Sequence, residues 1–212
     1  MRIVFMGTPD FAVQSLKALI EANQQVVGVV TMPDKPAGRG HKLQFSPVKE
    51  YALEKGLRIL QPEKLKNDDF LAELRSLQAD LQIVVAFRML PEVVWNMPPL
   101  GTFNLHASLL PQYRGAAPIN WAIINGETQT GVTTFFIDDK IDTGAMILHK
   151  KIVIGADETA GELHDRLMLL GSETVIETLA LIEKQKAVTT IQVENPDVKT
   201  AYKLNKDNCK ID

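Results

Sequence analysis

Apolar runs alternate with stretches of helical periodicity from the first residues of the chain onward. The run Arg2–Met6 leads through Gly7 into a segment with apolar residues at helical spacing, and a second apolar run follows at Val26–Thr31. A strand, a helix and a strand in this order are the opening of a parallel α/β sheet. Thr8 precedes Pro9 at the start of the helix, and this pair is typical of an N-cap and a first helical residue. The pattern therefore predicts a helix capped by Thr8.

The same alternation continues to about residue 186. The polar segment Pro33–Phe45 interrupts it and is expected to be a loop. The apolar spacing predicts helices at 47–55, 68–78 and 158–183, strands at 81–86, 102–106, 131–137 and 145–153, and a weaker strand at 187–193. These elements predict an α/β fold with an open, mostly parallel, Rossmann-like sheet and helices on both faces.

One domain, residues 1–190, accounts for all of the strong periodicity. The remaining segment, 191–212, is polar and contains several lysines, and we expect it to be a linker. Apolar residues make up 45% of the chain, which is enough to build a core. The formal charge of −3 gives no overall attraction to nucleic acid, so any contact with RNA must come from a local basic patch.

Cysteine usage and hydropathy indicate the cellular setting. Cys209 is the only cysteine, which excludes an intrachain disulfide and a multi-cysteine metal site. No apolar run approaches the ~18 residues that a membrane-spanning helix needs. The N-terminus enters a strand at once and lacks the pattern of a signal peptide. We expect the protein to be cytoplasmic, to be monomeric and to have no membrane partner.

Three polar residues suggest a catalytic site. Asn104 and His106 are two residues apart on a predicted strand, so their side chains point to the same face. Asp142 follows a later strand, on a loop that ends in glycine. An amide, an imidazole and a carboxylate are the groups needed to move an acyl group between two nitrogens. A purely structural polar network is the alternative, because the sequence does not show that the three meet.

The turn after the first strand argues against a dinucleotide cofactor. Enzymes that bind NAD or a flavin carry three spaced glycines there, whereas this chain has Gly7 alone, followed by Pro9 and the bulky Phe11. The aspartates between residues 138 and 142 supply too few oxygen ligands for a dedicated metal site. We therefore expect neither a nicotinamide or flavin cofactor nor a metal.

Two further segments have both a functional and a structural interpretation. Residues 86–90 follow a central strand at its carboxyl end, where ligands bind in such sheets, and their main chain would suit a flat heteroaromatic ring. The alternative is a plain connection between elements. The basic segment 34–42 contains Arg39 and Lys42, which would suit a polyanion, and the alternative is a solvated surface loop.

Taken together, these segments resemble the folate-dependent formyltransferases. The resemblance is carried by Asn104-x-His106, Ser108-Leu109-Leu110-Pro111-x-x-x-Gly115-Ala116-x-Pro118 and Asp142-x-Gly144. The branch of the family that formylates initiator methionyl-tRNA is matched further, at Gly7-Thr8-Pro9-Asp10-Phe11, 33–40, 46–49, 61–62 and Ala201-Tyr202-Lys203-Leu204. The resemblance covers essentially the whole chain.

The resemblance implies transfer of formyl from 10-formyltetrahydrofolate, a co-substrate, to the amino group of methionine on initiator tRNA, for translation initiation. In this reaction Asn104 would donate to the oxyanion, His106 would move protons, and Asp142 would fix the charge and orientation of the imidazole. The implied folate contacts are Ser108, Leu109, Leu110, Pro111, Ala86, Phe87, Arg88, Met89, Leu90, Asp138 and Asp139, and the implied tRNA contacts are Arg39 and Lys42.

The chain departs from the family pattern at two places. Phe87-Arg88 stands where many members have a Tyr-Gly pair, which affects the expected contacts with the pterin. Members of the family normally continue into a β-barrel domain that grips tRNA. We therefore expect 1–190 to be the catalytic domain, and 191–212 to lead toward a C-terminal tRNA-binding domain absent from this chain. Folate binding should then be intact and tRNA formylation severely weakened.

Other functions remain open at this point. Glycinamide ribonucleotide formyltransferases are the nearest rivals, but they need a glycine-rich phosphate loop after the first strand. Amino-sugar nucleotide formyltransferases share the Asn-His-Asp set. A hydrolase that releases formate would use water as the acceptor. A non-catalytic module that binds folate or RNA is the alternative from a different class.

Overall fold

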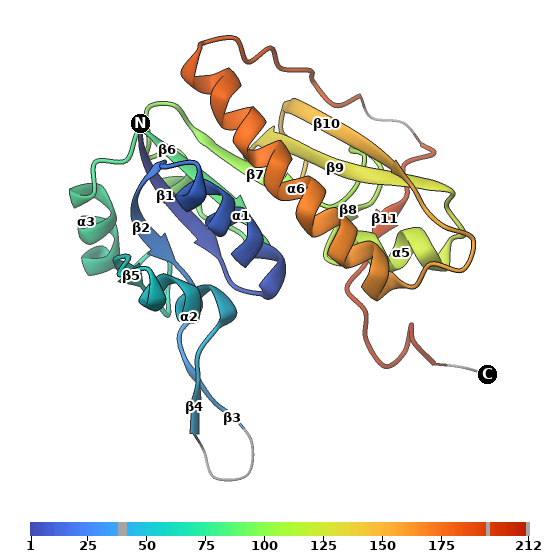
Figure 1. Ribbon diagram of the computed structural model, residues 1–212, viewed down its shortest axis with the longest axis horizontal. Coiled ribbons are helices and arrows are strands. Elements are labelled where there is room, and N and C mark those ends of the chain that lie inside the picture. Colours follow the sequence, from blue (N-terminus) through green and yellow to red (C-terminus); the bar gives the residue numbers. More distant parts are fainter. Residues whose placement is uncertain (38–41, 194–195, 211–212) are drawn as a thin grey trace.

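A seven-stranded sheet forms the centre of the protein (Figure 1). The computed structural model describes residues 1–37, 42–193 and 196–210, and only the backbone of 36–37 and 42–43. The sheet has the order β10-β9-β7-β6-β1-β2-β5. Its strands are β1 (Arg2–Gly7), β2 (Gln25–Val30), β5 (Ile59–Leu60), β6 (Leu81–Val85), β7 (Thr102–His106), β9 (Gln129–Phe136) and β10 (Met146–Val153).

Most of the sheet is parallel. β7, β6, β1, β2 and β5 pair in parallel, whereas β9 is antiparallel to both of its neighbours. The predicted α/β fold with a mostly parallel sheet is therefore confirmed. The antiparallel turn from β9 into β10 creates a loop, residues 137–145, that is long enough to fold back over the sheet.

Alternation along β1 directs its side chains into two cores. Ile3 and Phe5 belong to one cluster, and Val4 and Met6 belong to the other, because successive strand residues point to opposite faces. The first core lies under α1 (Asp10–Glu21), α2 (Pro47–Glu54), α5 (Pro118–Ile124) and α6 (Ala160–Glu183). The second lies under α3 (Asp68–Ser76) and α4 (Glu92–Trp95). Helices thus cover both faces, as the sequence predicted.

The longest helix, α6, is defined at its start and packed closely in its middle. The hydroxyl of Thr159 accepts a hydrogen bond from the backbone N–H of Glu162, whose carboxylate accepts one from the backbone N–H of Thr159. This reciprocal capping box fixes the first turn. A Cβ added at Gly171 would lie 2.7 Å from Leu105, so the absence of a side chain lets α6 approach β7.

The start of α1 differs from the prediction. The helix begins at Asp10 with Pro9 as its N-cap, and the backbone N–H of Ala12 donates to the Pro9 carbonyl. Thr8 therefore lies one position outside the cap, and its buried hydroxyl oxygen has no hydrogen-bond partner in the described part of the chain. The prediction that Thr8 caps the helix was wrong because proline occupies the N-cap position rather than the first helical one.

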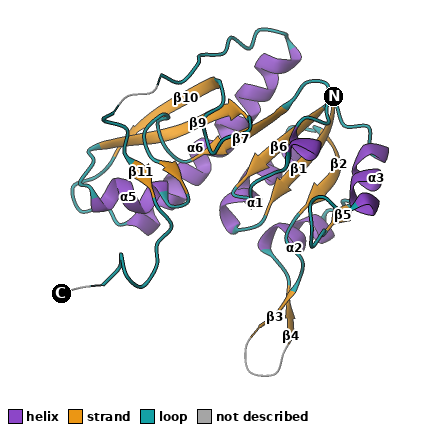
Figure 2. Cartoon of the chain, turned by 180° about the vertical axis from the view of Figure 1, so that it is seen from behind, coloured by secondary structure: helices purple, strands orange, loops and turns teal. Residues whose placement is uncertain are grey.

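The segment expected to be a polar loop contains a hairpin. Within it, β3 (Lys35–Ala37) pairs antiparallel with β4 (Lys42–Gln44) and projects from the body of the protein (Figure 2). A side-chain contact ties its base to α2, since the Lys49 ammonium lies 2.5 Å from the Asp34 carboxylate. That hydrogen bond lowers the pKa of Asp34 below its ordinary value.

The C-terminal segment also differs from the expectation. Residues 187–193 form a single bridge, between Thr190 and Met146, rather than the weaker strand predicted there. Further on, β11 (Thr200–Ala201) pairs in parallel with β8 (Arg114–Gly115). Part of the predicted linker therefore packs on the domain, near α5 (Figures 1 and 2).

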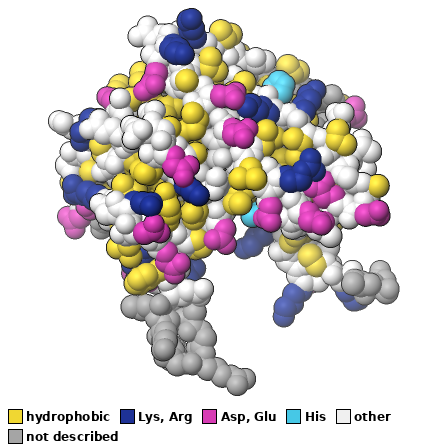
Figure 3. All heavy atoms as spheres, in the orientation of Figure 1, with side chains coloured by type: hydrophobic (Ala, Val, Ile, Leu, Met, Phe, Trp, Pro, Cys, Tyr) yellow, Lys and Arg dark blue, Asp and Glu magenta, His cyan; other side chains and the backbone are white. Residues whose placement is uncertain are grey.

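Acidic and basic side chains are interspersed over the face of the protein in Figure 3. No patch of a single sign dominates this face, consistent with the small net charge. Among the described residues, no helix has both the length and the hydropathy needed to cross a membrane.

Candidate active site

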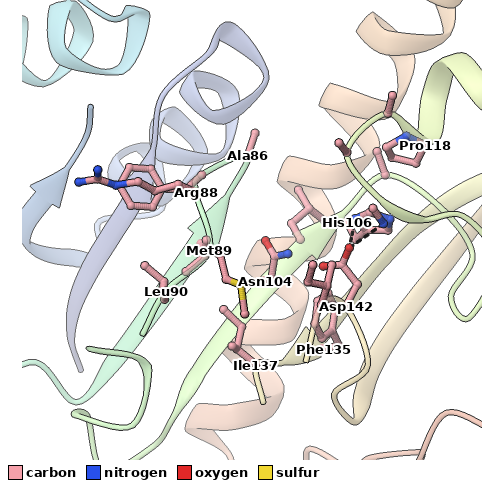
Figure 4. Close-up of a pocket in the computed structure, with 18 of the residues that line it drawn as sticks. Ala86, Arg88, Met89, Leu90, Asn104, His106, Pro118, Phe135, Ile137 and Asp142 are labelled. Atoms are coloured by element: carbon pink, nitrogen blue, oxygen red, sulfur yellow. Dashed lines mark hydrogen bonds and ion pairs between the residues drawn. The ribbon is translucent and has the colours of Figure 1, made fainter. Parts of the chain in front are cut away.

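A cavity of about 610 Å³ opens at the carboxyl ends of β6 and β7 (Figure 4). Asn104 and His106 both line it from β7, whereas Phe103 packs in the core on the opposite face of the sheet. Asp142 lines it from the loop between β9 and β10. The structure thus brings together the three residues that the sequence singled out, across a separation of 36 to 38 positions along the chain.

His106 is 6% exposed, and protein oxygens face both of its ring nitrogens. Nε2 lies 2.7 Å from the carbonyl oxygen of Tyr113. A carbonyl only accepts, so Nε2 carries the proton. Nδ1 lies 3.8 Å from Oδ2 of Asp142, and the two groups form an ion pair when the imidazole is doubly protonated.

The carboxylate of Asp142 has a second fixed partner. Its Oδ2 accepts a hydrogen bond of 2.9 Å from the backbone N–H of Gly115. Tyr113 and Gly115 belong to one short segment, so the same stretch of backbone holds both the imidazole and the carboxylate. Asp142 itself has a φ of 55°, in the left-handed region that residues other than glycine rarely adopt. Its position therefore depends on contacts that hold the surrounding loop.

Contacts within the loop itself shape the residues around Asp142. The Asp138 carboxylate accepts hydrogen bonds from the Thr143 hydroxyl, at 2.8 and 3.0 Å, and from the backbone N–H of Lys140. A Cβ added at Gly144 would lie 1.7 Å from the carbonyl oxygen of Phe136. Only glycine allows the backbone to pass so close at this point, which explains the Asp142-x-Gly144 spacing.

Asn104 presents an open amide to the cavity. Its side chain points into the same space as His106 and Asp142 (Figure 4). Within the described residues the amide has no hydrogen-bond partner in the protein. A half-buried amide in this state can donate to a bound ligand, and the arrangement therefore offers a preformed donor next to a histidine and a carboxylate.

Residues 86–90 form another wall of the cavity, and all five line it. The segment begins with Ala86 at a φ of 48°. In the part of the chain that the structure describes, no backbone–backbone hydrogen bond involves Phe87, Arg88 or Met89. Their main-chain donors and acceptors are available to a ring that lies against this wall.

The Arg88 side chain turns away from the cavity (Figure 4). Its guanidinium donates to the carbonyl oxygens of Pro62 and Glu63, the latter at 2.8 Å. Burial lowers the pKa of this guanidinium. Arg88 thus adds a contact with the 61–63 segment, and the residue also lines the cavity.

The turn Ser108–Pro111 does not line the cavity. The fully buried Ser108 hydroxyl donates to the carbonyl of Gln112, and Thr133 bonds to the turn at Ser108 and Leu110. These contacts bring Tyr113 back to His106, so the turn supports the imidazole from behind. The implied contact of this turn with folate stays a prediction.

Other predicted site residues lie apart from the cavity or outside the described chain. Asp138 lines the cavity, whereas Asp139 is exposed and does not. Arg39 lies outside the described residues, and of Lys42 only the backbone is described. The predicted contact of Arg39 and Lys42 with tRNA stays a prediction.

Several residues at the site received no role from the sequence. Gly115 to Asn120 line the cavity, and the Gly-Ala-x-Pro motif was the signal that marked them. Tyr113 and Gln192 contact the His106–Asp142 pair from outside the cavity. Nothing in the local pattern around Gln192 identifies it. Among the described residues, no group of three or more His, Cys, Asp or Glu side chains could hold a metal ion.

A polar network links this region to the C-terminal segment. The Tyr113 hydroxyl donates to the Glu127 carboxylate and accepts from Asn125, at 3.0 Å for the latter. The Lys199 ammonium lies 2.5 Å from the same carboxylate. The hydrogen bond between Lys199 and Glu127 lowers the pKa of Glu127 and raises the pKa of Lys199. Burial raises the pKa of the Tyr113 hydroxyl.

The chain matches known proteins over its whole length. A family described as "Formyl transferase" matches residues 1–179. A protein of Flavobacterium johnsoniae named methionyl-tRNA formyltransferase is 70% identical over 212 residues, covering 100% of this chain and 67% of its own length. One of Bacteroides fragilis with the same name is 60% identical, covering 100% and 66%. The chain thus spans about two thirds of the length of these relatives.

Solved structures share the fold. A phosphoribosylglycinamide formyltransferase from Anaplasma phagocytophilum has a TM-score of 0.74 at 18% identity, covering 96% of this chain and 99% of its own. An N-formyltransferase from Helicobacter canadensis, in complex with folinic acid and dTDP-3-aminofucose, has a TM-score of 0.71 at 22% identity, covering 99% and 74%. At these identities the likeness concerns the architecture alone.

Proposed function

The chain belongs to the formyl transferase family, and from this we propose that it transfers a formyl group from 10-formyltetrahydrofolate to the amino group of methionine on initiator tRNA. The observation that carries the proposal is the shared cavity of Asn104, His106 and Asp142, in a chain 70% identical to a protein named for this reaction. We place this reaction in the cytoplasm as part of the proposal.

Each of the three residues has a chemical task in the proposed reaction. The Asn104 amide would donate to the formyl oxygen, on which negative charge develops as the amine adds. Protonated His106 would add positive charge beside that oxygen, and its Nδ1, the ring nitrogen that does not bond to the Tyr113 carbonyl, would exchange protons with the reacting nitrogens. Asp142, at 3.8 Å, would balance the imidazolium and hold its orientation.

The cavity suits a folate as co-substrate. 10-Formyltetrahydrofolate supplies the formyl group. The unbonded backbone of Phe87, Arg88 and Met89 fits the flat, hydrogen-bonding ring of a pterin, and apolar residues such as Leu90 and Ile137 surround it. Asp138, Asp139 and the turn Ser108–Pro111 are proposed as further contacts by resemblance.

Recognition of tRNA is proposed for the β3–β4 hairpin. Arg39 and Lys42 would contact the acceptor end, because guanidinium and ammonium groups pair with phosphate. We also propose that residues 191–212 are a linker toward a tRNA-binding domain.

The test is formyl transfer from 10-formyltetrahydrofolate to methionine-charged initiator tRNA at high enzyme and low salt. His106→Ala should abolish it, and His149→Ala, at an exposed position outside the cavity, should leave it unchanged. Undiminished transfer by His106→Ala would contradict the proposal. A parallel assay with an amino-sugar nucleotide as acceptor would identify another formyltransferase if only that amine is formylated.

A further inference from the structure

Gln192 is a buried amide whose hydrogen-bonding capacity is used on the loop that carries Asp142. Its Nε2 donates to the carbonyl oxygens of Asp142 and Gly144, each at 2.9 Å. Its Oε1 accepts from Nε and Nη2 of Arg114, at 3.0 and 2.7 Å. The side chain is 7% exposed, so these bonds are shielded from water. Gln192 lies beyond residue 179, where the match to the family ends.

Only one orientation of this amide satisfies its surroundings. Two carbonyls require the donor end, and a guanidinium requires the acceptor end. Arg114 therefore fixes which end of Gln192 faces Asp142. The two donated bonds bracket a backbone whose φ of 55° is rare for a residue other than glycine. Without them the loop is free to relax from this conformation.

The segment that follows in the chain holds the other side of the same assembly. The carbonyl of Lys199 accepts from the N–H of Tyr113 at 2.6 Å, and the carbonyl of Ala201 accepts from the N–H of Ala116 at 2.7 Å. Between these two bonds, Gly115 directs its N–H to Asp142. A Cβ at Gly115 would lie 2.4 Å from the Ala201 oxygen, so this close contact requires glycine.

We propose that Gln192 is a positioning residue for Asp142: it holds the loop backbone so that the carboxylate stays between His106 and the Gly115 N–H. Residues 199–201 hold the opposing segment, which supplies that N–H and the carbonyl facing His106. Both supports come from the C-terminal segment, after the last long helix. The effect on turnover rests on the proposed function, whereas the effect on the Asp142 position does not.

The direct test is amide hydrogen exchange at Gly115 in the whole chain, because this N–H bonds to the Asp142 side chain. Gln192→Glu keeps an acceptor for Arg114 but removes both donors, and Gln192→Leu removes all of the bonds. Each should accelerate exchange at Gly115 about 10-fold or more, as Asp142→Ala should. Exchange at Ala116, which bonds to Ala201 instead, should change less than twofold. Ile191→Ala, at an exposed neighbouring position, is the matched control and should change neither amide.

A second arm follows turnover in a double-mutant cycle. Gln192→Glu should lower kcat about 10-fold, and the same substitution in an Asp142→Asn background should lower it less than twofold, because its effect passes through Asp142. Equal losses in both backgrounds would overturn the proposal, as would unchanged exchange at Gly115 or parallel acceleration at Ala116. If the unsubstituted chain formylates no amine, the proposed function fails, and the exchange measurement still decides the role of Gln192.

Discussion

Nδ1 of His106 lies 3.8 Å from Oδ2 of Asp142, and the neighbouring backbone supplies a hydrogen-bond partner to each of them. The carbonyl of Tyr113 faces the imidazole, and the N–H of Gly115 faces the carboxylate. One segment of main chain therefore sets the geometry of the pair, and changes in that segment act on both groups at once.

Removing the open amide of the cavity should reduce the rate with little effect on folding. Asn104→Ala is expected to lower kcat on the order of 100-fold or more, because removing one preorganised donor to a developing oxyanion slows other enzymes by such a factor. The measurement is single-turnover formyl transfer, and folate binding checks that the cavity is intact. A loss under threefold would remove Asn104 from the mechanism.

A methyl group at Gly144 should disturb the Asp142 loop. The added Cβ would lie 1.7 Å from the Phe136 carbonyl oxygen, so the backbone must shift. Gly144→Ala is expected to lower the free energy of unfolding by roughly 1–3 kcal/mol, as overpacking does, and to reduce turnover. Urea denaturation measures the first effect. Gly161 lies in helix α6, and a Cβ added there would be 3.9 Å from the Thr159 hydroxyl. Gly161→Ala should therefore leave the free energy of unfolding unchanged or raise it.

Docking of the C-terminal segment should depend on pH through Glu127 and Lys199. The pKa of Glu127 is lowered from 4.5, so its contribution is complete above pH 4.5 and is lost as pH falls through the folded-state value. The pKa of Lys199 is raised from 10.5, so its contribution is complete below pH 10.5 and is lost as pH rises through the folded-state value.

Trp121 reports this docking, because its indole N–H donates to the Tyr202 carbonyl at 2.7 Å. In a Trp95→Phe background, its fluorescence should change below pH 4.5. Lys199→Met should weaken that transition, because it removes the larger of the two hydrogen bonds that lower the pKa of Glu127, while the bond from Tyr113 remains. A transition that persists unchanged in Lys199→Met would assign the pH dependence to another group.

The capping box of α6 should contribute measurably to stability. Thr159→Ala removes the hydroxyl that accepts from Glu162 and is expected to lower the free energy of unfolding by about 1 kcal/mol. Thermal denaturation measures this loss. Thr159→Ser keeps the hydroxyl and should therefore lose much less unfolding free energy than Thr159→Ala. Equal losses in the two variants would attribute the effect to packing of the methyl group.

The strands and the shared face of Asn104 and His106 were predictable because both depend on local periodicity. The two-residue repeat of a strand places these side chains together regardless of what surrounds them. The supports of Asp142 were not predictable in the same way. Gln192 lies 50 residues from Asp142 and 78 from Arg114, in a segment whose own pattern predicts only a weak strand. Contacts of this kind are set by tertiary packing and leave no local signal.

Because β11 pairs with β8, the chain continues to support the candidate active site after the last strand of the seven-stranded sheet has ended. Every strand of the seven-stranded sheet and all the long helices are complete by Glu183. A chain shortened to that residue would keep every strand of this sheet, yet Gly115 and Asp142, which both line the cavity, would each lose a support. The part of the chain that forms the seven-stranded sheet therefore ends earlier in the sequence than the part that positions Asp142. A pulling force applied to the C-terminal segment would displace the His106–Asp142 pair before it disturbed the sheet.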